Sequence, residues 1–184
     1  MELKDAKMVG TRTHANLVRH WKEKSVEKCK IQIYQKKAGR EARHIQAILG
    51  ELAVYQYVHA AQAHRVLWGP YEDVEKNLER LIAWEREHVR DFGEYARIAR
   101  EEGFAEIAEA FDMMAKVDED QEKKFADILG KIKGGGIFRK EGEQDWYCQQ
   151  CGNVHRGESA PEHCPLCKEP RRYFELKGAN FSVF

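Results

Sequence analysis

Four of the five cysteines fall in one short stretch and follow a metal-ligand spacing. Cys148 and Cys151 form a first C-x2-C pair, and Cys164 and Cys167 form a second pair shortly after it. Four thiolates in two such turns suit tetrahedral coordination of zinc or of a single iron ion. Zinc would make the site structural, whereas iron would make it a one-electron carrier. The remaining cysteine, Cys29, has no activating neighbour in the sequence, and we expect it to be a small core residue.

Length and charge exclude several classes of protein. The chain has 184 residues, of which 42% are apolar and 34% are charged, and its 31 basic residues balance its 31 acidic residues. Binding to nucleic acid through phosphates would require a basic excess. No apolar run of about 18 residues could span a membrane, and residues 1–5 contain no apolar signal core. We therefore expect a soluble, cytoplasmic protein that binds neither nucleic acid nor membrane, in which paired cysteines bind metal rather than form disulfides.

The elements that position these residues are mainly helical. Between residues 12 and 133 apolar residues recur at helical spacing, with breaks at Gly39, Pro70 and Gly103. Four helices joined in this way predict a four-helix bundle over residues 1–133. Gly134–Gly136 then ends the pattern and predicts a hinge. Residues 134–184, which contain the four cysteines, should form a small metal-binding domain of strands and loops, stabilised by its metal.

Several polar residues interrupt the apolar stripes near the middles of these helices. Side chains from all four helices could converge there, so the polar residues need an explanation beyond ordinary core packing. They are Lys24, Gln56, His59, Glu87, Asp118 and Gln121.

Further motifs occur in order along nearly the whole chain. They include Gly10–Thr13, the run from Glu94 to Phe104, and a C-terminal set that joins Trp146, the four cysteines and Tyr173-Phe174-Glu175. In order and spacing these motifs resemble those of rubrerythrins. The resemblance implies a ferritin-like helical domain followed by a rubredoxin-like domain. It implies a peroxide reductase, in which electrons enter at a rubredoxin-type iron and pass to a carboxylate-bridged di-iron centre in the bundle. It also implies a homodimer, with the rubredoxin-like domain of one subunit against the bundle of another.

At the positions of the family's di-iron ligands this sequence differs sharply. The resemblance places these positions on Lys24 in the first helix, Gln56 and His59 in the second, Trp84 and Glu87 in the third, and Asp118 and Gln121 in the fourth. The three charged residues among them leave a net charge of −1, which is far from neutralising two iron ions. A buried ammonium beside two metals would be strongly unfavourable, and an indole would fill space that a ligand needs. We therefore expect that the usual di-iron site is lost and that the bundle binds at most one metal.

Three replacements for that site are open. The first is a metal-free network in which Lys24 pairs with Glu87 and Asp118 while Gln56 and Gln121 complete the hydrogen bonds. The second is a single divalent metal on His59, Glu87 and Asp118. The third is a shifted site that uses Glu85-x-x-His88, whose spacing puts both side chains on one helix face, together with Glu51 or Glu119.

These observations predict a redox metalloprotein of mainly α fold. Electrons would pass through a rubredoxin-type iron on four cysteines to an altered site in the bundle that acts on peroxide, oxygen or a small molecule. The alternative is a non-catalytic electron-transfer or interaction module, or a zinc-ribbon scaffold, with a metal-free bundle. The residues do not identify the electron donor or establish that the chain is an enzyme.

Overall fold

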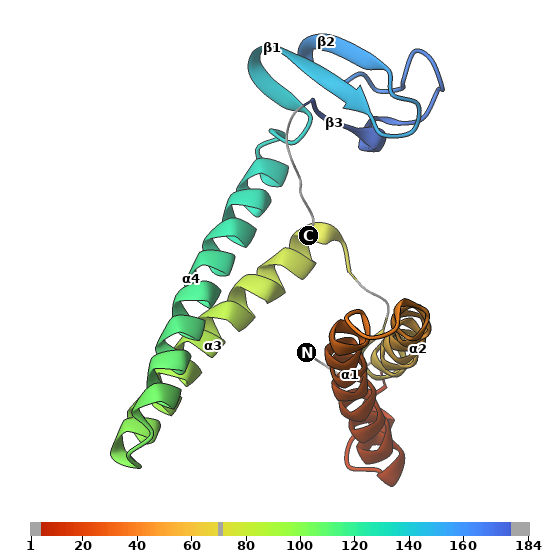
Figure 1. The fold of residues 1–184 in the computed structure, drawn as a ribbon. Helices are drawn as coiled ribbons and strands as arrows, with labels where there is room; N and C mark the ends of the chain where they lie inside the picture. Colours follow the sequence, from red (N-terminus) through yellow and green to blue (C-terminus); the bar gives the residue numbers. More distant parts are fainter. Residues whose placement is uncertain (1–4, 70–71, 178–184) are drawn as a thin grey trace. The chain divides into compact units, whose positions relative to one another are not determined.

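The computed structural model describes residues 5–69 and 72–177, and in these residues four long helices precede a small sheet (Figure 1). The fold class predicted from the sequence, four helices followed by a small domain with a four-cysteine cluster, is confirmed. The chain forms two compact units, Met1–Glu72 and Asp73–Phe184. The helices are α1 (Arg12–Ala38), α2 (Arg43–Trp68), α3 (Val74–Glu101) and α4 (Ala105–Lys133). Short 3-10 helices cover Ala6–Met8 and Arg171–Tyr173.

In the first unit α1 and α2 lie side by side as a helical hairpin. The Thr11 hydroxyl caps α1 by accepting a hydrogen bond from the His14 N–H at 3.1 Å. Lysines in the last turn of α1 complement the helix dipole. On α2 the buried residues are mostly small, which lets the two backbones approach closely; they are Ala53, Ala60, Ala63 and Leu67.

One expectation for this unit is wrong. Cys29 is exposed on α1 and is not a core residue. The preceding residue, Lys28, places its ammonium 5.0 Å from the ring centroid of Tyr57 on α2. Because successive helical residues are rotated by about 100°, Cys29 falls beside this contact rather than in it.

In the second unit α3 and α4 form another hairpin. Asp73 caps α3 by accepting a hydrogen bond from the Lys76 N–H at 2.9 Å. The turn into α4 needs a left-handed residue, which Gly103 supplies with a φ of +87°. The face of α3 toward α4 carries a regular stripe whose steps alternate between three and four residues. It comprises Leu78, Ile82, Glu85, Val89, Phe92, Ala96 and Ala99, of which all but Glu85 are apolar.

The three glycines after α4 end the helix through a specific turn. Gly135 has a φ of +68°, and the Gly136 N–H donates a hydrogen bond to the Lys131 carbonyl at 2.8 Å. This is the arrangement in which a left-handed glycine satisfies the last helical carbonyls. The glycine run therefore acts as a helix terminator, and the boundary that we place between residues 133 and 134 stays a prediction.

The C-terminal part forms a three-stranded antiparallel sheet in the order β2-β1-β3. The strands are β1 (Arg139–Cys148), β2 (Val154–Ser159) and β3 (Phe174–Leu176). Trp146 on the central strand is fully buried, and its indole N–H donates a hydrogen bond to the Gly157 carbonyl at 2.9 Å. The buried cluster of this domain comprises Trp146, Cys148, Ala160, Cys164 and Phe174. So small a core needs a further source of stability.

None of the helices within the described residues is both long and apolar enough to cross a lipid bilayer.

Candidate metal centres

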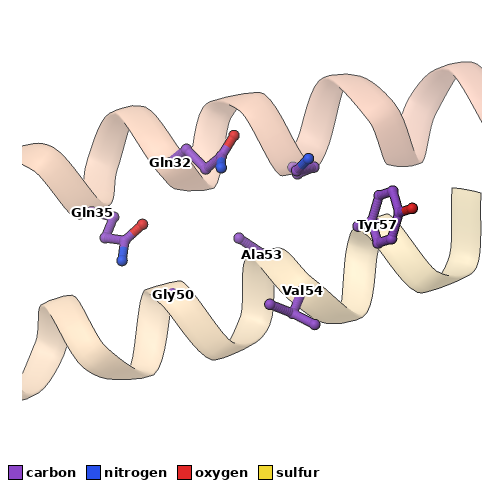
Figure 2. A pocket seen from close by; sticks show the side chains of 7 residues that line it. Gln32, Gln35, Gly50, Ala53, Val54 and Tyr57 are labelled. Atoms are coloured by element: carbon purple, nitrogen blue, oxygen red, sulfur yellow. The ribbon is translucent and has the colours of Figure 1, made fainter. Parts of the chain in front are cut away.

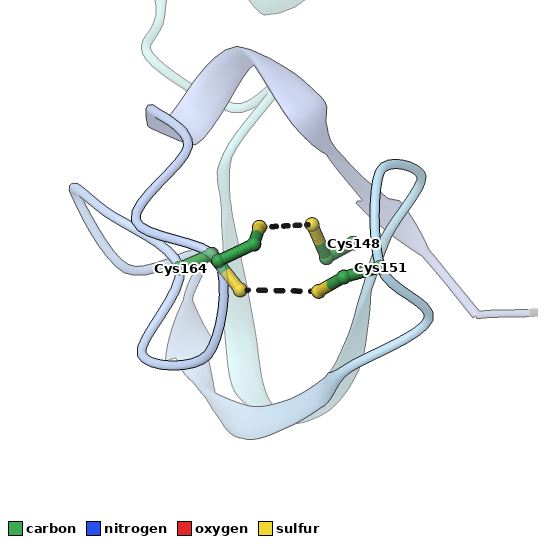
Figure 3. Close-up of side chains that lie close together, drawn as sticks. Cys148, Cys151 and Cys164 are labelled. Atoms are coloured by element: carbon green, nitrogen blue, oxygen red, sulfur yellow. Dashed lines mark hydrogen bonds between the residues drawn. The ribbon is translucent and has the colours of Figure 1, made fainter.

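The sulfur atoms of the four predicted ligands form a cage of tetrahedral size (Figure 3). The Sγ atoms of Cys148 and Cys167 are 3.8 Å apart, and those of Cys151 and Cys164 are 3.6 Å apart. A tetrahedral site with metal–sulfur bonds of about 2.3 Å has sulfur–sulfur edges of about 3.8 Å. A disulfide would require about 2.05 Å. The four side chains therefore fit one tetrahedrally coordinated metal.

Two turns with the same hydrogen bonds present these sulfurs. In the first turn the Cys148 N–H donates to the Asn153 carbonyl at 2.8 Å, and the Gly152 N–H donates to the Cys148 carbonyl at 2.9 Å. The second turn repeats both bonds: the Cys164 N–H donates to the Glu169 carbonyl at 2.7 Å, and the Lys168 N–H donates to the Cys164 carbonyl at 3.0 Å.

Each turn also needs a left-handed residue directly after its second cysteine. Gly152 has a φ of +78°, and Lys168, without the freedom of glycine, has a φ of +64°. The metal-binding loops are thus two copies of one backbone motif, and the second copy contains a strained residue.

The thiols differ in their tendency to ionise. Burial opposes ionisation of Cys164, but hydrogen bonds to its sulfur, led by the N–H groups of Cys167 and Leu166, hold its pKa at about 7. At Cys167 the Glu169 N–H favours the thiolate, yet burial and hydrogen bonds to the other three cysteines raise the pKa to about 12. One thiolate therefore forms readily, whereas four adjacent thiolates need the charge of a bound metal.

A second group of potential ligands lies between α3 and α4. Single ligand atoms of Glu85, His88 and Asp118 all lie within 4.8 Å of one another. The distance from His88 Nδ1 to Asp118 Oδ2 is 3.9 Å. The Gln121 amide donates a hydrogen bond to Asp118 Oδ1 at 3.2 Å. Burial and the Asp118 carboxylate raise the pKa of Glu85, while His88 acts in the opposite direction.

This group partly matches the shifted site considered from the sequence. The Glu85-x-x-His88 pair is present, and within this hairpin Asp118 lies beside it, although the sequence interpretation named Glu51 or Glu119 as the third ligand. Glu119 is exposed, and Glu51 on α2 accepts a hydrogen bond from the Tyr55 hydroxyl. The sequence interpretation placed Asp118 at a family ligand position through its spacing from Gln121, and named it as a metal ligand only together with His59 and Glu87.

The other residues at the family positions are spread over both units. In the second unit Trp84 has half of its surface exposed, and Glu87 is also exposed. In the first unit Lys24 forms an ion pair with Glu27 at 2.7 Å, and His59 is exposed. The buried Gln56 Oε1 has no hydrogen-bond partner among the described residues. The convergence of these positions, including a pairing of Lys24 with Glu87 and Asp118, stays a prediction.

A groove between α1 and α2 is a further hollow in the first unit (Figure 2). Its lining residues are Lys28, Gln32, Gln35, Gly50, Ala53, Val54 and Tyr57. The groove is narrow at Gly50, because a Cβ there would lie 2.6 Å from the Gln35 amide nitrogen. None of these seven described residues carries a carboxylate, imidazole or thiol, so they offer no strong ligand for a metal.

Comparisons with known proteins agree with this arrangement. Residues 146–175 match the family model described as rubrerythrin, rubredoxin-like domain. Rubrerythrin of Nitratidesulfovibrio vulgaris is 33% identical over 94% of this chain and 97% of its own length. Rubrerythrin-1 of Clostridium acetobutylicum is 28% identical over the same shares of the two chains. A solved structure of nigerythrin in a partially reduced state aligns over 95% of this chain and 90% of its own at 19% identity, with a TM-score of 0.35, which is too low to add to the assignment.

Four long helices followed by a four-cysteine sheet domain define a helical metalloprotein with a rubredoxin-type site. Because the Nitratidesulfovibrio vulgaris rubrerythrin is 33% identical and aligns along nearly its full length, the chain belongs to the rubrerythrin family. It is accordingly a rubrerythrin-like redox metalloprotein whose rubredoxin-type cysteine cluster suits iron or zinc.

Proposed function

We propose that the chain transfers single electrons through one iron held by its four cysteines to an altered site in the helical region. The observation that supports this most directly is the agreement of the sulfur–sulfur distances, 3.6 and 3.8 Å, with one tetrahedral ion. Bound iron would supply one-electron exchange between its ferrous and ferric states.

The protein residues around the cysteines suit such an exchange. Cys148 and Cys164 are fully buried, so half of the ligand set is shielded from water. N–H groups directed at sulfur stabilise negative charge on the ligands and thereby tune the potential. The outer cysteines are only partly buried, and Leu166, between Cys164 and Cys167, is 65% exposed. This apolar edge offers an electron donor a close approach to the site.

The residues at the family's di-iron positions do not fit two metals. Lys24 contributes a positive charge where a carboxylate is needed, and Trp84 has no ligand atom for iron. On α4 the Gln121 amide is engaged with Asp118, which leaves that aspartate as the strong ligand of the pair. We therefore propose that the helical region binds at most one metal and that electrons do not pass to a di-iron centre.

The test is the metal content per chain, by element, after aerobic purification. We expect one iron with thiolate charge-transfer colour that bleaches on reduction, and at most one further metal. Two further irons would contradict the proposal. Zinc at the cysteines, without any redox response, would instead support the scaffold alternative.

A rebuilt variant tests the assignment of the lost ligands. Lys24→Glu, Gln56→Glu, Trp84→Glu and Gln121→His together should allow the helices to gain iron beside His59, Glu87 and Asp118. The triple variant that retains Lys24 is the matched control and should gain less, because the ammonium opposes the metal charge. Equal iron content in both variants would show that Lys24 lies outside the metal site.

We further propose that the protein acts as a homodimer, as its family resemblance implies. In this arrangement the cysteine domain of one subunit would deliver electrons to the helices of the other. Light scattering at micromolar concentration should give the mass of a dimer or a larger assembly, and a monomer would contradict this proposal.

A further inference from the structure

We propose that Glu85, His88 and Asp118 form a binding site for a single divalent transition-metal ion within the α3–α4 hairpin. This inference deepens the proposed function, because it identifies residues of the altered helical site, but the metal binding itself does not depend on electron transfer. The site lies one residue away from the family's ligand positions on α3, since Trp84 and Glu87 are not members of it.

The first argument is the convergence of three strong ligands from two helices. Glu85 and His88 are one helical turn apart and therefore share a face of α3, and Asp118 approaches that face from α4. Their ligand atoms are within 4.8 Å of one another, and the imidazole-to-carboxylate distance is 3.9 Å. Ligand atoms bound to one ion at about 2.0–2.2 Å in a tetrahedral site would lie about 3.3–3.6 Å apart. The separations in the structure, all within 4.8 Å, are somewhat longer, so binding of an ion draws the three side chains together.

The second argument is the position of Glu85 in the apolar stripe. Ile82 and Val89, its neighbours in the α3–α4 seam, are buried and half-buried, and Glu85 is itself half-buried. A carboxylate in this position, close to a second one on α4, is unfavourable unless a cation compensates the two charges. Arg86, the adjacent cation on α3, instead donates to Glu122 at 2.9 Å. Within this hairpin no lysine or arginine of the described residues forms an ion pair with Glu85 or Asp118.

The third argument is that Asp118 is already oriented. Gln121 donates to its Oδ1, while the other oxygen, Oδ2, faces His88. A hydrogen bond that holds one oxygen and leaves the other toward the ligand group is the usual support of a metal-binding carboxylate.

The ligand types define the class of ion. One imidazole with two carboxylates suits Zn²⁺, Fe²⁺, Co²⁺ or Mn²⁺ rather than a soft ion. Three protein ligands leave at least one coordination position for water or another small molecule, as in catalytic rather than structural sites. Since 52% of the His88 side chain is exposed, such a molecule can reach the ion from solvent.

Equilibrium dialysis with Co²⁺ tests the inference on the full chain whose cysteine site is already filled. We expect one additional Co²⁺ per chain, with weak ligand-field absorption and no thiolate charge transfer. Glu85→Gln, His88→Asn and Asp118→Asn should each lower the affinity at least about tenfold. His88→Asn changes an exposed residue and therefore leaves the seam intact. Glu87→Gln and Glu119→Gln remove neighbouring exposed carboxylates and should leave the affinity unchanged.

The inference is overturned if no additional Co²⁺ binds, if the three site variants bind it as tightly as the parent, or if Glu87→Gln weakens binding as much as Glu85→Gln. The colour and reduction of the iron at the cysteines are followed in the same samples. Loss of Co²⁺ binding with that redox response intact refutes this site alone. A redox-silent cysteine centre with intact Co²⁺ binding refutes the proposed electron transfer alone.

Discussion

Replacing Cys164 with alanine is expected to abolish metal binding at the cysteines and to unfold residues 137–177, while α1 to α4 stay folded. Cys164 is fully buried and belongs to the cluster that forms the core of this domain. Its Sγ atom lies 3.6 Å from the Sγ atom of Cys151 and completes the set of four ligands. The substitution therefore removes a ligand and leaves three thiols around an incomplete site.

The magnitude follows from the small size of this core. Trp146 and Phe174 are its large apolar side chains, and burying each contributes about 1.5–3 kcal/mol. Binding of a structural metal contributes roughly 10–16 kcal/mol. The metal contribution is thus larger than that of the two buried rings by a wide margin, and its loss dominates the effect of the substitution.

Hydrogen–deuterium exchange with mass spectrometry, combined with metal analysis, measures the outcome. Amides of β1 to β3 should lose protection in Cys164→Ala, and those of the helices should keep it. Cys29→Ala is the matched control, because this exposed cysteine lies on α1 outside the cluster, and it should retain metal and protection. A Cys164→Ala protein that keeps one metal with the parent's colour would refute the assignment.

Further predictions concern single residues in both metal regions. In protein freed of metal at the helices, Glu85→Gln should raise the melting temperature at pH 7, because burial raises the pKa of this carboxyl and its ionisation destabilises the fold. The gain should vanish well below pH 4.5, where the glutamate is protonated in both the folded and the unfolded protein. An equal gain at both pH values would contradict this reasoning. Trp146→Phe should destabilise the cysteine domain by about 1–3 kcal/mol, measured by denaturant unfolding, because the Gly157 carbonyl loses its partner. Gly152→Ala should destabilise that domain by about 1–2 kcal/mol and Lys168→Gly should stabilise it by up to about 1 kcal/mol, since both positions are left-handed. Thermal melts in which Gly152→Ala is the more stable variant, or Lys168→Gly the less stable one, than the parent would refute the strain argument.

Features that depend on local spacing can be predicted from the sequence. The two C-x2-C pairs predict a four-thiolate site, because each pair closes its own turn and needs only one distant partner. The apolar period and its breaks at Gly39, Pro70 and Gly103 predict four helices, since helical structure follows from contacts within a few residues. The family resemblance rests on the same kind of ordered local motif, and a long alignment supports it.

Which residues meet across two helices depends on tertiary packing and cannot be predicted from local spacing. Helical spacing pairs Glu85 with His88, but the rotation and register of α4 against α3 select Asp118 rather than Glu119 as their neighbour. The same dependence on rotation exposes Cys29, which we predicted to be a core residue from its type and its lack of an activating neighbour. Contacts of this kind require two elements to be placed to within about one residue, and a rotation of about 100° exchanges one ligand for the next.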